Sequence, residues 1–185
     1  MNKTLKIAIK YALYYAPDFL KGWMKRLSHR VEIHQAKQRQ KRTRVSKEEI
    51  HQIIEQLPLD CDVMLHTSKI NIGYLEGGTA YIAEEIMNKV DLAHHTLLVS
   101  ALPYRGTFYD YLKKEHVFDV RVAPIAMGAI NKYIGSLPEA ERSVHPTHSV
   151  VAIGKDAVYY TSEHALDQTP FGMHSPYYKL IRRGG

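Results

Sequence analysis

Two histidines flank a proline in the segment His-Pro-Thr-His-Ser at residues 145–149, directly before the apolar run 150–153. Pro146 has a fixed φ angle and holds the preceding residue, His145, in an extended conformation. A histidine at the end of a strand is well placed to act as a general base, because its ordinary pKa lies near neutral pH. The residues alone favour a simpler interpretation, in which the histidine only hydrogen-bonds a loop.

A turn rich in serine, threonine and glycine spans residues 66–79. It follows a predicted strand and precedes a predicted helix, so the free backbone amides of the helix N-terminus could bind an anion. The turn has neither the spacing of a P-loop nor that of a dinucleotide-binding glycine motif. An ordinary turn is therefore the commoner explanation for Gly77-Gly78 before a helix.

A third motif, residues 167–176, reads Asp-Gln-Thr-Pro-Phe-Gly-Met-His-Ser-Pro. Its prolines and glycine predict an ordered loop without helix. Asp167 could orient or stabilise a charged base, or bind a cationic substrate amine, while its ordinary role would be a turn that closes the loop. His174 stands in no pattern that singles it out.

Several catalytic patterns are missing from the sequence. It contains no His-Glu-x-x-His pair of zinc ligands, no paired Cys–His spacing and no Gly-x-Ser-x-Gly nucleophile motif. Cys61 is the only cysteine, which excludes an intramolecular disulfide and a cysteine metal cluster. We expect a protein without a metal site.

The length of 185 residues is enough for one domain with a hydrophobic core, and 45% hydrophobic with 24% charged residues is ordinary for a globular protein. No apolar run approaches the roughly 18 residues of a membrane-spanning helix. The first 20 residues make a poor signal peptide, because lysines interrupt their apolar part and no cleavage site follows. We therefore expect a cytoplasmic protein.

The net charge of +6 originates in the N-terminal region. Up to Arg44 the chain has 12 lysines and arginines against two acidic residues, whereas the remainder has 13 against 17. We expect residues 1–45 to form a basic, aromatic arm and residues 46–185 to form the folded domain. The arm resembles a helix on an anionic membrane more than a reader of nucleic-acid bases, and a helix packed on a partner subunit fits equally well. No pattern indicates an oligomeric state.

Apolar periodicity predicts alternating helices and strands. The first helix begins at the capping box Ser46–Glu49, ends before Pro58 and has an apolar face of Ile50, Ile53, Ile54 and Leu57. Buried strands are predicted at residues 62–66, 96–102 and 150–153, and further helices up to Val90 and at 127–134. This alternation predicts an α/β fold with a central sheet.

The order of these motifs resembles that of the aminoglycoside 3-N-acetyltransferases, across about residues 60–185. The matching segments are His66-Thr67-Ser68, Ile72-Gly73, Gly77-Gly78, residues 98–103, Phe118–Arg121, residues 124–128, Arg142-Ser143, residues 145–154, Asp167, residues 169–172, Ser175-Pro176 and Gly184-Gly185. Each motif is weak alone, but the set in this order is specific.

The resemblance implies a three-layer α/β/α fold with a central mixed sheet. It implies an enzyme that moves an acetyl group from acetyl-CoA to an amino group of a small-molecule acceptor, an amino sugar or an aminoglycoside. By the same resemblance, His145 would be the general base, Asp167 would hold that base or a cationic substrate, and His174 would bind substrate beside Asp167. The residues that would hold the pantetheine and pyrophosphate of CoA are His66, Thr67, Ser68, Gly73, Gly77, Gly78 and Thr79.

Two departures from the family pattern shape the expected function. Family members continue past the position of Gly185 with a segment that completes the sheet and the acceptor pocket, so we expect the domain to be incomplete. The N-terminal arm is also longer and more basic than in the resistance enzymes. We expect acetylation of an amino sugar, with antibiotic resistance through aminoglycoside acetylation as the alternative and a non-catalytic CoA-binding module as a third hypothesis.

Overall fold

The computed structural model describes residues 43–67, 73–114, 117–126 and 128–185, together with short stretches of the N-terminal region at residues 17, 20–24, 27–28, 30–31, 33–34 and 38. The chain divides into two compact units. One comprises Met1–Arg44 with Ile70–Tyr74, and the other comprises Val45–Lys69 with Leu75–Gly185.

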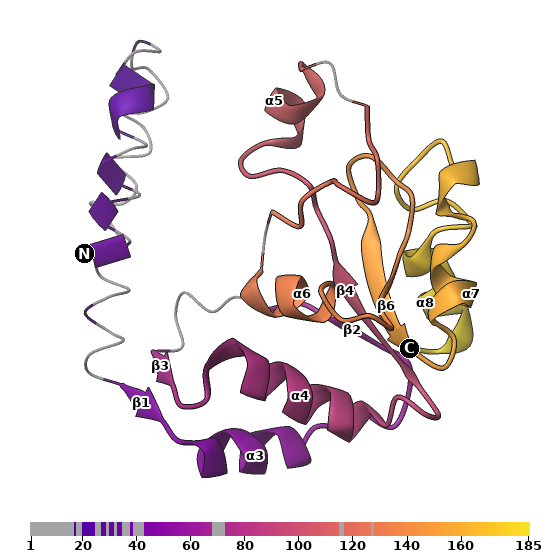
Figure 1. Cartoon of the computed structure of the whole chain (residues 1–185). Helices are drawn as coiled ribbons and strands as arrows, with labels where there is room; N and C mark the ends of the chain where they lie inside the picture. The colour runs from indigo at the N-terminus through magenta and orange to yellow at the C-terminus, as the bar shows by residue number, and fades with distance from the viewer. Residues whose placement is uncertain are drawn as a thin grey trace. The chain divides into compact units, whose positions relative to one another are not determined.

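A four-stranded mixed sheet forms the centre of the larger unit, in the order β2-β4-β6-β5 (Figure 1). Its strands are β2 (Val63–Leu65), β4 (Thr96–Ser100), β5 (Glu141–Arg142) and β6 (Val150–Gly154). The β2–β4 pair is parallel, and the β4–β6 and β5–β6 pairs are antiparallel. The predicted strands thus form, although the first two are shorter than the expected ranges.

The register brings one end of each of three strands to the same edge of the sheet. Leu65 pairs with Val99 near the ends of β2 and β4, and Ser100 pairs with Val150 at the start of β6. Residues 66–67, 101–102 and 145–149 therefore leave or enter the sheet at this edge. We call it the histidine edge.

The side chains of the central strands alternate between two hydrophobic clusters. In β4, Leu97 and Val99 join the larger cluster with Ile86, Ile134 and other residues, whereas Leu98 faces the smaller one. On β6 the alternation repeats, with residues 151 and 153 in the first cluster and residues 150 and 152 in the second. The sheet is therefore covered on both faces, which confirms the three-layer α/β/α architecture.

Helices α3, α4 and α6 supply one layer, and α7 and α8 supply the other (Figure 1). Their bounds are α3 (Lys47–Glu55), α4 (Gly78–Val90), α6 (Ala129–Ile134), α7 (Ala157–Thr161) and α8 (Pro176–Arg183). A short helix α5 (Phe108–Leu112) follows β4, and a 3₁₀ turn η2 (His164–Leu166) follows α7. The sequence patterns did not predict α5, α7, η2 or α8.

Helix α3 begins as its sequence predicts. Ser46 accepts a hydrogen bond from the Glu49 amide, and the Glu49 carboxylate accepts one from the Ser46 amide, which completes the capping box. The predicted apolar face is narrower than expected, because Ile53 is 58% exposed and Leu57 is 41% exposed. Only the two isoleucines at 50 and 54 enter the core.

The strands β1 (Arg44–Val45) and β3 (Tyr74–Leu75) form a separate two-stranded sheet. Gly73 precedes β3 with a φ of 98°, and an added Cβ would lie 2.7 Å from the carbonyl oxygen of Thr43. This close approach requires glycine. Within the described parts of the chain, no helix is long and apolar enough to cross a membrane.

Gly154, at the end of β6, should be intolerant of a side chain. Its φ is 115°, and a Cβ would collide with the carbonyl oxygen of His95. We expect Gly154→Ala to lower the free energy of unfolding by about 3 kcal/mol or more, because backbone strain and a collision add. Urea unfolding measures this change.

Gly106 provides the matched control, since its φ is 93° but no atom lies within 4 Å of an added Cβ. Gly106→Ala should cost only the backbone strain, about 1 kcal/mol. If Gly154→Ala and Gly106→Ala lowered the free energy of unfolding by the same amount, the protein would accommodate the added Cβ at Gly154 without an energetic penalty.

Candidate active site

The turn at residues 145–149 fixes the ring of His145 through its own backbone. The Nδ1 atom of His145 accepts hydrogen bonds from the backbone amides of Thr147 at 3.3 Å and His148 at 3.1 Å. A backbone amide can only donate, so Nδ1 carries the lone pair and the proton of the neutral ring is on Nε2. His145 is therefore presented as a hydrogen-bond donor through Nε2.

The environment of His145 opposes a positive charge. The residue is 7% exposed, and burial together with the nearby His164 and His148 lowers its pKa from 6.5 to about 4. Asp167 acts in the opposite direction and raises that pKa, which places its carboxylate within electrostatic reach of the ring. His145 is consequently neutral at pH 7.

His164 lies under His145 and has a structural role. The two rings stack with centroids 4.6 Å apart. His164 Nε2 lies 3.1 Å from the carbonyl oxygen of Pro170 and must donate to it, so Nδ1 accepts from the Ser143 hydroxyl at 2.9 Å. Ser143 in turn accepts from the amide of Val150. Both ring nitrogens of this fully buried histidine are therefore occupied.

Arg142 connects the segments that meet at the histidine edge. Its guanidinium donates to the carbonyl oxygens of Ala101, Ala123 and Pro124 and to the hydroxyl of Ser149. Ser149 also donates to the Ala101 carbonyl. Burial lowers the pKa of Arg142, but the ordinary value is so high that the group stays charged.

Asp167 and His174 form a hydrogen-bonded pair on the loop before α8. The His174 ring Nδ1 lies 3.0 Å from Asp167 Oδ1, and the His174 amide donates to Oδ2 at 3.0 Å. The Asp167 side chain is 7% exposed, while that of His174 is 37% exposed. Gly172 makes room for the carboxylate, because an added Cβ would collide with it.

His148 faces the aromatic side of the site. Its ring contacts Phe108 and Phe171 edge-on, at centroid distances of 6.3 Å and 5.4 Å. Its Nδ1 lies 2.9 Å from the hydroxyl of Thr147, and burial lowers its pKa. Both phenylalanines are about half exposed. An apolar rim therefore adjoins the polar histidines.

The predicted CoA-binding residues fall in three places. His66 and Thr67 directly follow β2 and so lie at the histidine edge. Gly77 and Gly78 begin α4 with positive φ angles, and no side chain caps that helix end. Thr79 occupies the first turn of α4, Gly73 belongs to the smaller unit, and Ser68 lies outside the described residues.

The start of α4 is directed toward the histidine edge. Five residues join the end of α4 to the start of β4, so the helix runs back along the strand. Its 13 residues measure about 20 Å and the five residues of β4 about 16 Å. The first amides of α4 thus lie toward the edge where β4 ends.

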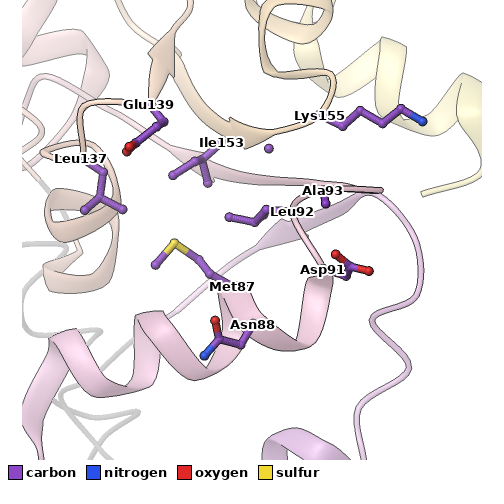
Figure 2. Close-up of a pocket in the computed structure, with 10 residues that line it drawn as sticks. Met87, Asn88, Asp91, Leu92, Ala93, Leu137, Glu139, Ile153 and Lys155 are labelled. Carbon is purple, nitrogen blue, oxygen red and sulfur yellow. The ribbon is translucent and has the colours of Figure 1, made fainter.

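An open pocket of about 700 Å³ lies at the opposite end of the sheet (Figure 2). Met87, Leu92, Leu137 and Ile153 supply its apolar lining. It adjoins Gly154 at the end of β6, whereas the turn with His145 precedes the start of that strand, about 16 Å away. None of the predicted site residues lines this pocket.

The histidine edge thus combines one neutral ring donor with one histidine–carboxylate pair. Among the residues that the structure describes, no group of three or more His, Cys, Asp or Glu side chains could hold a metal ion. Sequence reasoning matched Arg142-Ser143 to the family pattern without assigning either residue a role, and it missed His164. The proximity of Arg142-Ser143 to the histidine turn was the available signal for the first two.

Comparison with known proteins gives consistent results. The sequence profile of the family described as aminoglycoside 3-N-acetyltransferase matches residues 64–185. Aminoglycoside N(3)-acetyltransferase III of Serratia marcescens is 30% identical over 135 residues, which cover 66% of this chain and 49% of that protein. The chain spans about half the length of the curated relatives it matches.

Solved structures with the same fold include the aminoglycoside acetyltransferase AAC(3)-Xa. It aligns with a TM-score of 0.65 at 27% identity, over 84% of this chain and 59% of that one. AAC-VIa bound to sisomicin aligns with a TM-score of 0.60 at 25% identity, over 77% of this chain and 58% of that one.

The lowered pKa of His145 should make stability depend on pH. Its ring has a pKa of about 4 when folded and about 6.5 when unfolded, so the unfolded chain binds the proton first as pH falls. The contribution of the neutral His145 ring to the free energy of unfolding is fully present above pH 6.5, and it is lost as the pH falls toward 4. From this residue we expect about 2 kcal/mol lower stability at pH 5 than at pH 7.

Urea unfolding of the wild type and of His145→Gln at both pH values isolates this contribution, because glutamine does not titrate. The loss between pH 7 and pH 5 should be about 2 kcal/mol smaller in the variant. An identical pH dependence in the two proteins would mean that His145 is not buried as a neutral ring.

Proposed function

This chain belongs to the aminoglycoside 3-N-acetyltransferase family, and from that we propose that it transfers the acetyl group of acetyl-CoA to an amino group of an amino sugar or aminoglycoside. The observation that carries the proposal is the cluster of His145, His164 and the Asp167–His174 pair at one edge of the sheet. These residues all lie within the matched range. Acetyl-CoA is the co-substrate of this family, and we place the reaction in the cytoplasm.

The chemistry of the reaction explains why histidines are useful at this edge. An amine attacks a thioester only through its unprotonated nitrogen, and it must lose a further proton as the amide forms. The thioester oxygen gains negative charge during the attack and needs a hydrogen-bond donor. The histidine edge offers ring nitrogens for both tasks.

The start of α4 fits the phosphates of acetyl-CoA. No side-chain hydrogen bond caps the helix, and the space around Gly78 is open, whereas the side chains of Tyr81 and Lys47 pack against Gly77. Backbone amides and the helix dipole attract anions at such a position. His66 and Thr67 would lie along the pantetheine at the same edge, and Ser68 keeps the role expected from the family.

The acceptor is better described as an amino sugar with few charges than as a polycationic drug. AAC-VIa binds sisomicin, which makes an aminoglycoside the natural alternative. In this chain, however, three described carboxylates on α5 and on two loops already have partners: Asp110 accepts from Thr107, Asp119 from Arg121, and Asp167 from His174. A polycation is held by carboxylates that are free to pair with it.

Turnover should be detectable as release of free CoA thiol from acetyl-CoA in the presence of an amine acceptor. We expect activity with at least one member of a panel of amino sugars, nucleotide-linked amino sugars and aminoglycosides. His145→Ala should lower kcat by about 100-fold or more, because it removes a hydrogen-bonding ring from the site.

Ile53→Ser serves as the control, since this side chain is 58% exposed on α3 and should leave the rate unchanged. If calorimetry shows CoA binding while the whole panel gives no turnover, the chain is a non-catalytic CoA-binding module. Undiminished turnover in His145→Ala would remove His145 from the mechanism.

The N-terminal arm suggests a second partner, an anionic membrane surface. Leu20, Trp23, Leu27 and Val31 are between 37% and 56% exposed, and they follow one another at the three- and four-residue spacing of a helix face. Basic residues interleave with them. A helix of this composition lies in the membrane interface with its apolar face buried.

Sedimentation with vesicles that contain anionic lipid should show weak binding that high salt abolishes. Deletion of residues 1–45 should remove the binding, and replacement of Leu20, Trp23 and Leu27 by serine should weaken it. Binding that persists in the deletion variant would place the membrane contact elsewhere.

A further inference from the structure

We propose that the exposed rings of Phe108 and Phe171, on either side of His148, bind the sugar ring of the acceptor, and that this acceptor is a hexosamine with a single ammonium group. The assignment rests on the proposed acetyltransferase function and names the acceptor subsite of the same edge. Aromatic rings would here hold the acceptor in the way that free carboxylates hold a polycation.

A continuous series of ring contacts leads from His145 to the outer surface. The centroid of the His148 ring lies 6.1 Å from that of His145, and the rings of Phe171 and Phe108 lie 5.4 Å and 6.3 Å from His148. These rings come from the start of α5, the turn before β6 and the loop before α8 (Figure 1). We call the rings of Phe108 and Phe171 the aromatic platform. A single ring, that of His148, connects each of them to His145.

The platform is open to solvent. Phe171 is 60% exposed and Phe108 is 47% exposed, and Met173 on the same loop as Phe171 is 64% exposed. Both phenylalanines meet His148 at steep interplanar angles, 68° and 60°, so these contacts leave a large part of each ring uncovered. Neighbouring exposed apolar side chains beside polar groups are typical of a ligand site, whereas solitary ones are not.

The backbone on both sides of Phe171 is fixed, although its side chain is exposed. The carbonyl of Pro170 accepts a hydrogen bond from His164 Nε2 at 3.1 Å, and the glycine that follows Phe171 packs against the carboxylate of Asp167. Tyr177 contacts the ring from α8 at a centroid distance of 5.0 Å. The ring is thus positioned before a ligand binds, which reduces the conformational entropy lost on binding.

An aromatic face suits an amino sugar for two reasons. It carries partial negative charge, so it attracts the C–H groups on the apolar face of a pyranose ring. It also attracts an ammonium group that lies within about 6 Å of the ring centroid. Burial lowers the pKa of His145 and of His148, so at pH 7 the rings beside the platform add no positive charge that would repel the ammonium.

The charges around the platform fit an acceptor with one ammonium group. Asp167, on the same loop as Phe171, has a side chain that is 7% exposed and already contacts His174. Asp110, on α5 with Phe108, accepts a hydrogen bond from the hydroxyl of Thr107. Because these carboxylates have partners, several ammonium groups would lose their water without gaining charged partners. Contact with a ring face compensates one such group.

Substitutions at Phe171 distinguish an aromatic face from an apolar surface of any kind. Phe171→Leu keeps the apolar volume without a ring face. We expect it to raise the KM for the amino sugar about 10-fold and to change kcat by less than about 2-fold, because the platform contacts the ground state and the transition state equally. Phe171→Tyr should keep the wild-type KM, and the KM for acetyl-CoA should stay constant in both variants.

Tyr109→Leu is the matched control. This tyrosine lies on the same helix as Phe108 and is 64% exposed, but Lys113 Nζ lies 4.4 Å from its ring centroid and so occupies a ring face. The substitution should leave the KM for the amino sugar unchanged. A wild-type KM in Phe171→Leu, or an equal rise in Tyr109→Leu, would overturn the proposal and leave the acetyltransferase function intact.

NMR of the aromatic rings tests the platform without acetyl transfer. Titration of the full chain with methyl β-D-glucosaminide should shift the ring signals of Phe108 and Phe171 and transfer saturation from these rings to the sugar C–H protons. Phe171→Leu should abolish the transfer. Methyl β-D-glucoside, which has no amine, should bind more weakly because it lacks the cation–π contact.

Three results of this titration would overturn the proposal: shifts confined to other aromatic residues, tighter binding of sisomicin than of the glucosaminide at the same rings, or platform signals that respond to protein concentration instead of sugar. The last result would identify the platform as a contact between two copies of the chain. Sugar binding on the platform without turnover of acetyl-CoA would confirm the sugar site and refute the acetyltransferase function.

Discussion

The guanidinium of Arg142 holds together the part of the molecule on which the site depends. It joins the carbonyl after β4, the loop at residues 123–124 and the Ser149 hydroxyl that ends the histidine turn. The adjacent Ser143 links the start of β6 to His164. Because Arg142 ends β5 and Ser143 directly follows it, the end of this edge strand also fixes the turn before β6. The charged guanidinium can donate to several carbonyl groups at once, and these carbonyl groups have no hydrogen-bond partner within a helix or strand.

Three histidines at this edge have different properties because their nitrogens have different partners. His145 accepts from backbone amides, His164 accepts from a serine and donates to a carbonyl, and His174 donates to a carboxylate. Burial lowers the pKa of His145 and of His164. The side chain of His174 is 37% exposed and contacts a carboxylate. Proteins can give residues of the same type different roles, as acid, base or hydrogen-bond donor, by placing them in different chemical environments.

Much of the central fold could be predicted from the sequence, because it follows from local patterns. The capping box at Ser46, the apolar run that became β4 and the strand closed by Gly154 each depend on residues within a few positions of one another. Strand ends and the short helices after β6 were not predicted, since their apolar residues are few and the packing that stabilises them is long-range. The apolar face of α3 was predicted to be wider than it is, because long-range packing decides which of its apolar residues are buried.

The candidate site was predictable only in part. The sequence singled out His145 and Asp167, and the structure places both near the histidine edge, but it pairs Asp167 with His174. That pairing depends on Gly172, which leaves space for the carboxylate, and the 167–175 loop could not be folded from its sequence alone. His164 was missed because a histidine between acidic and apolar residues carries no signal of burial. The role of His164 is evident only from the folded structure, in which β6, the turn at residues 145–149 and the loop after η2 lie close together.

The central claim is that acetyl-CoA binds at the histidine edge. A titration of the isotope-labelled full chain with CoA, followed by backbone amide NMR shifts, tests it most directly. The account predicts the largest shifts at Gly78, Thr147 and His148, with Gly154 and Lys155 unchanged. Shifts confined to Gly154, Lys155 and the other residues around the pocket in Figure 2 would contradict it.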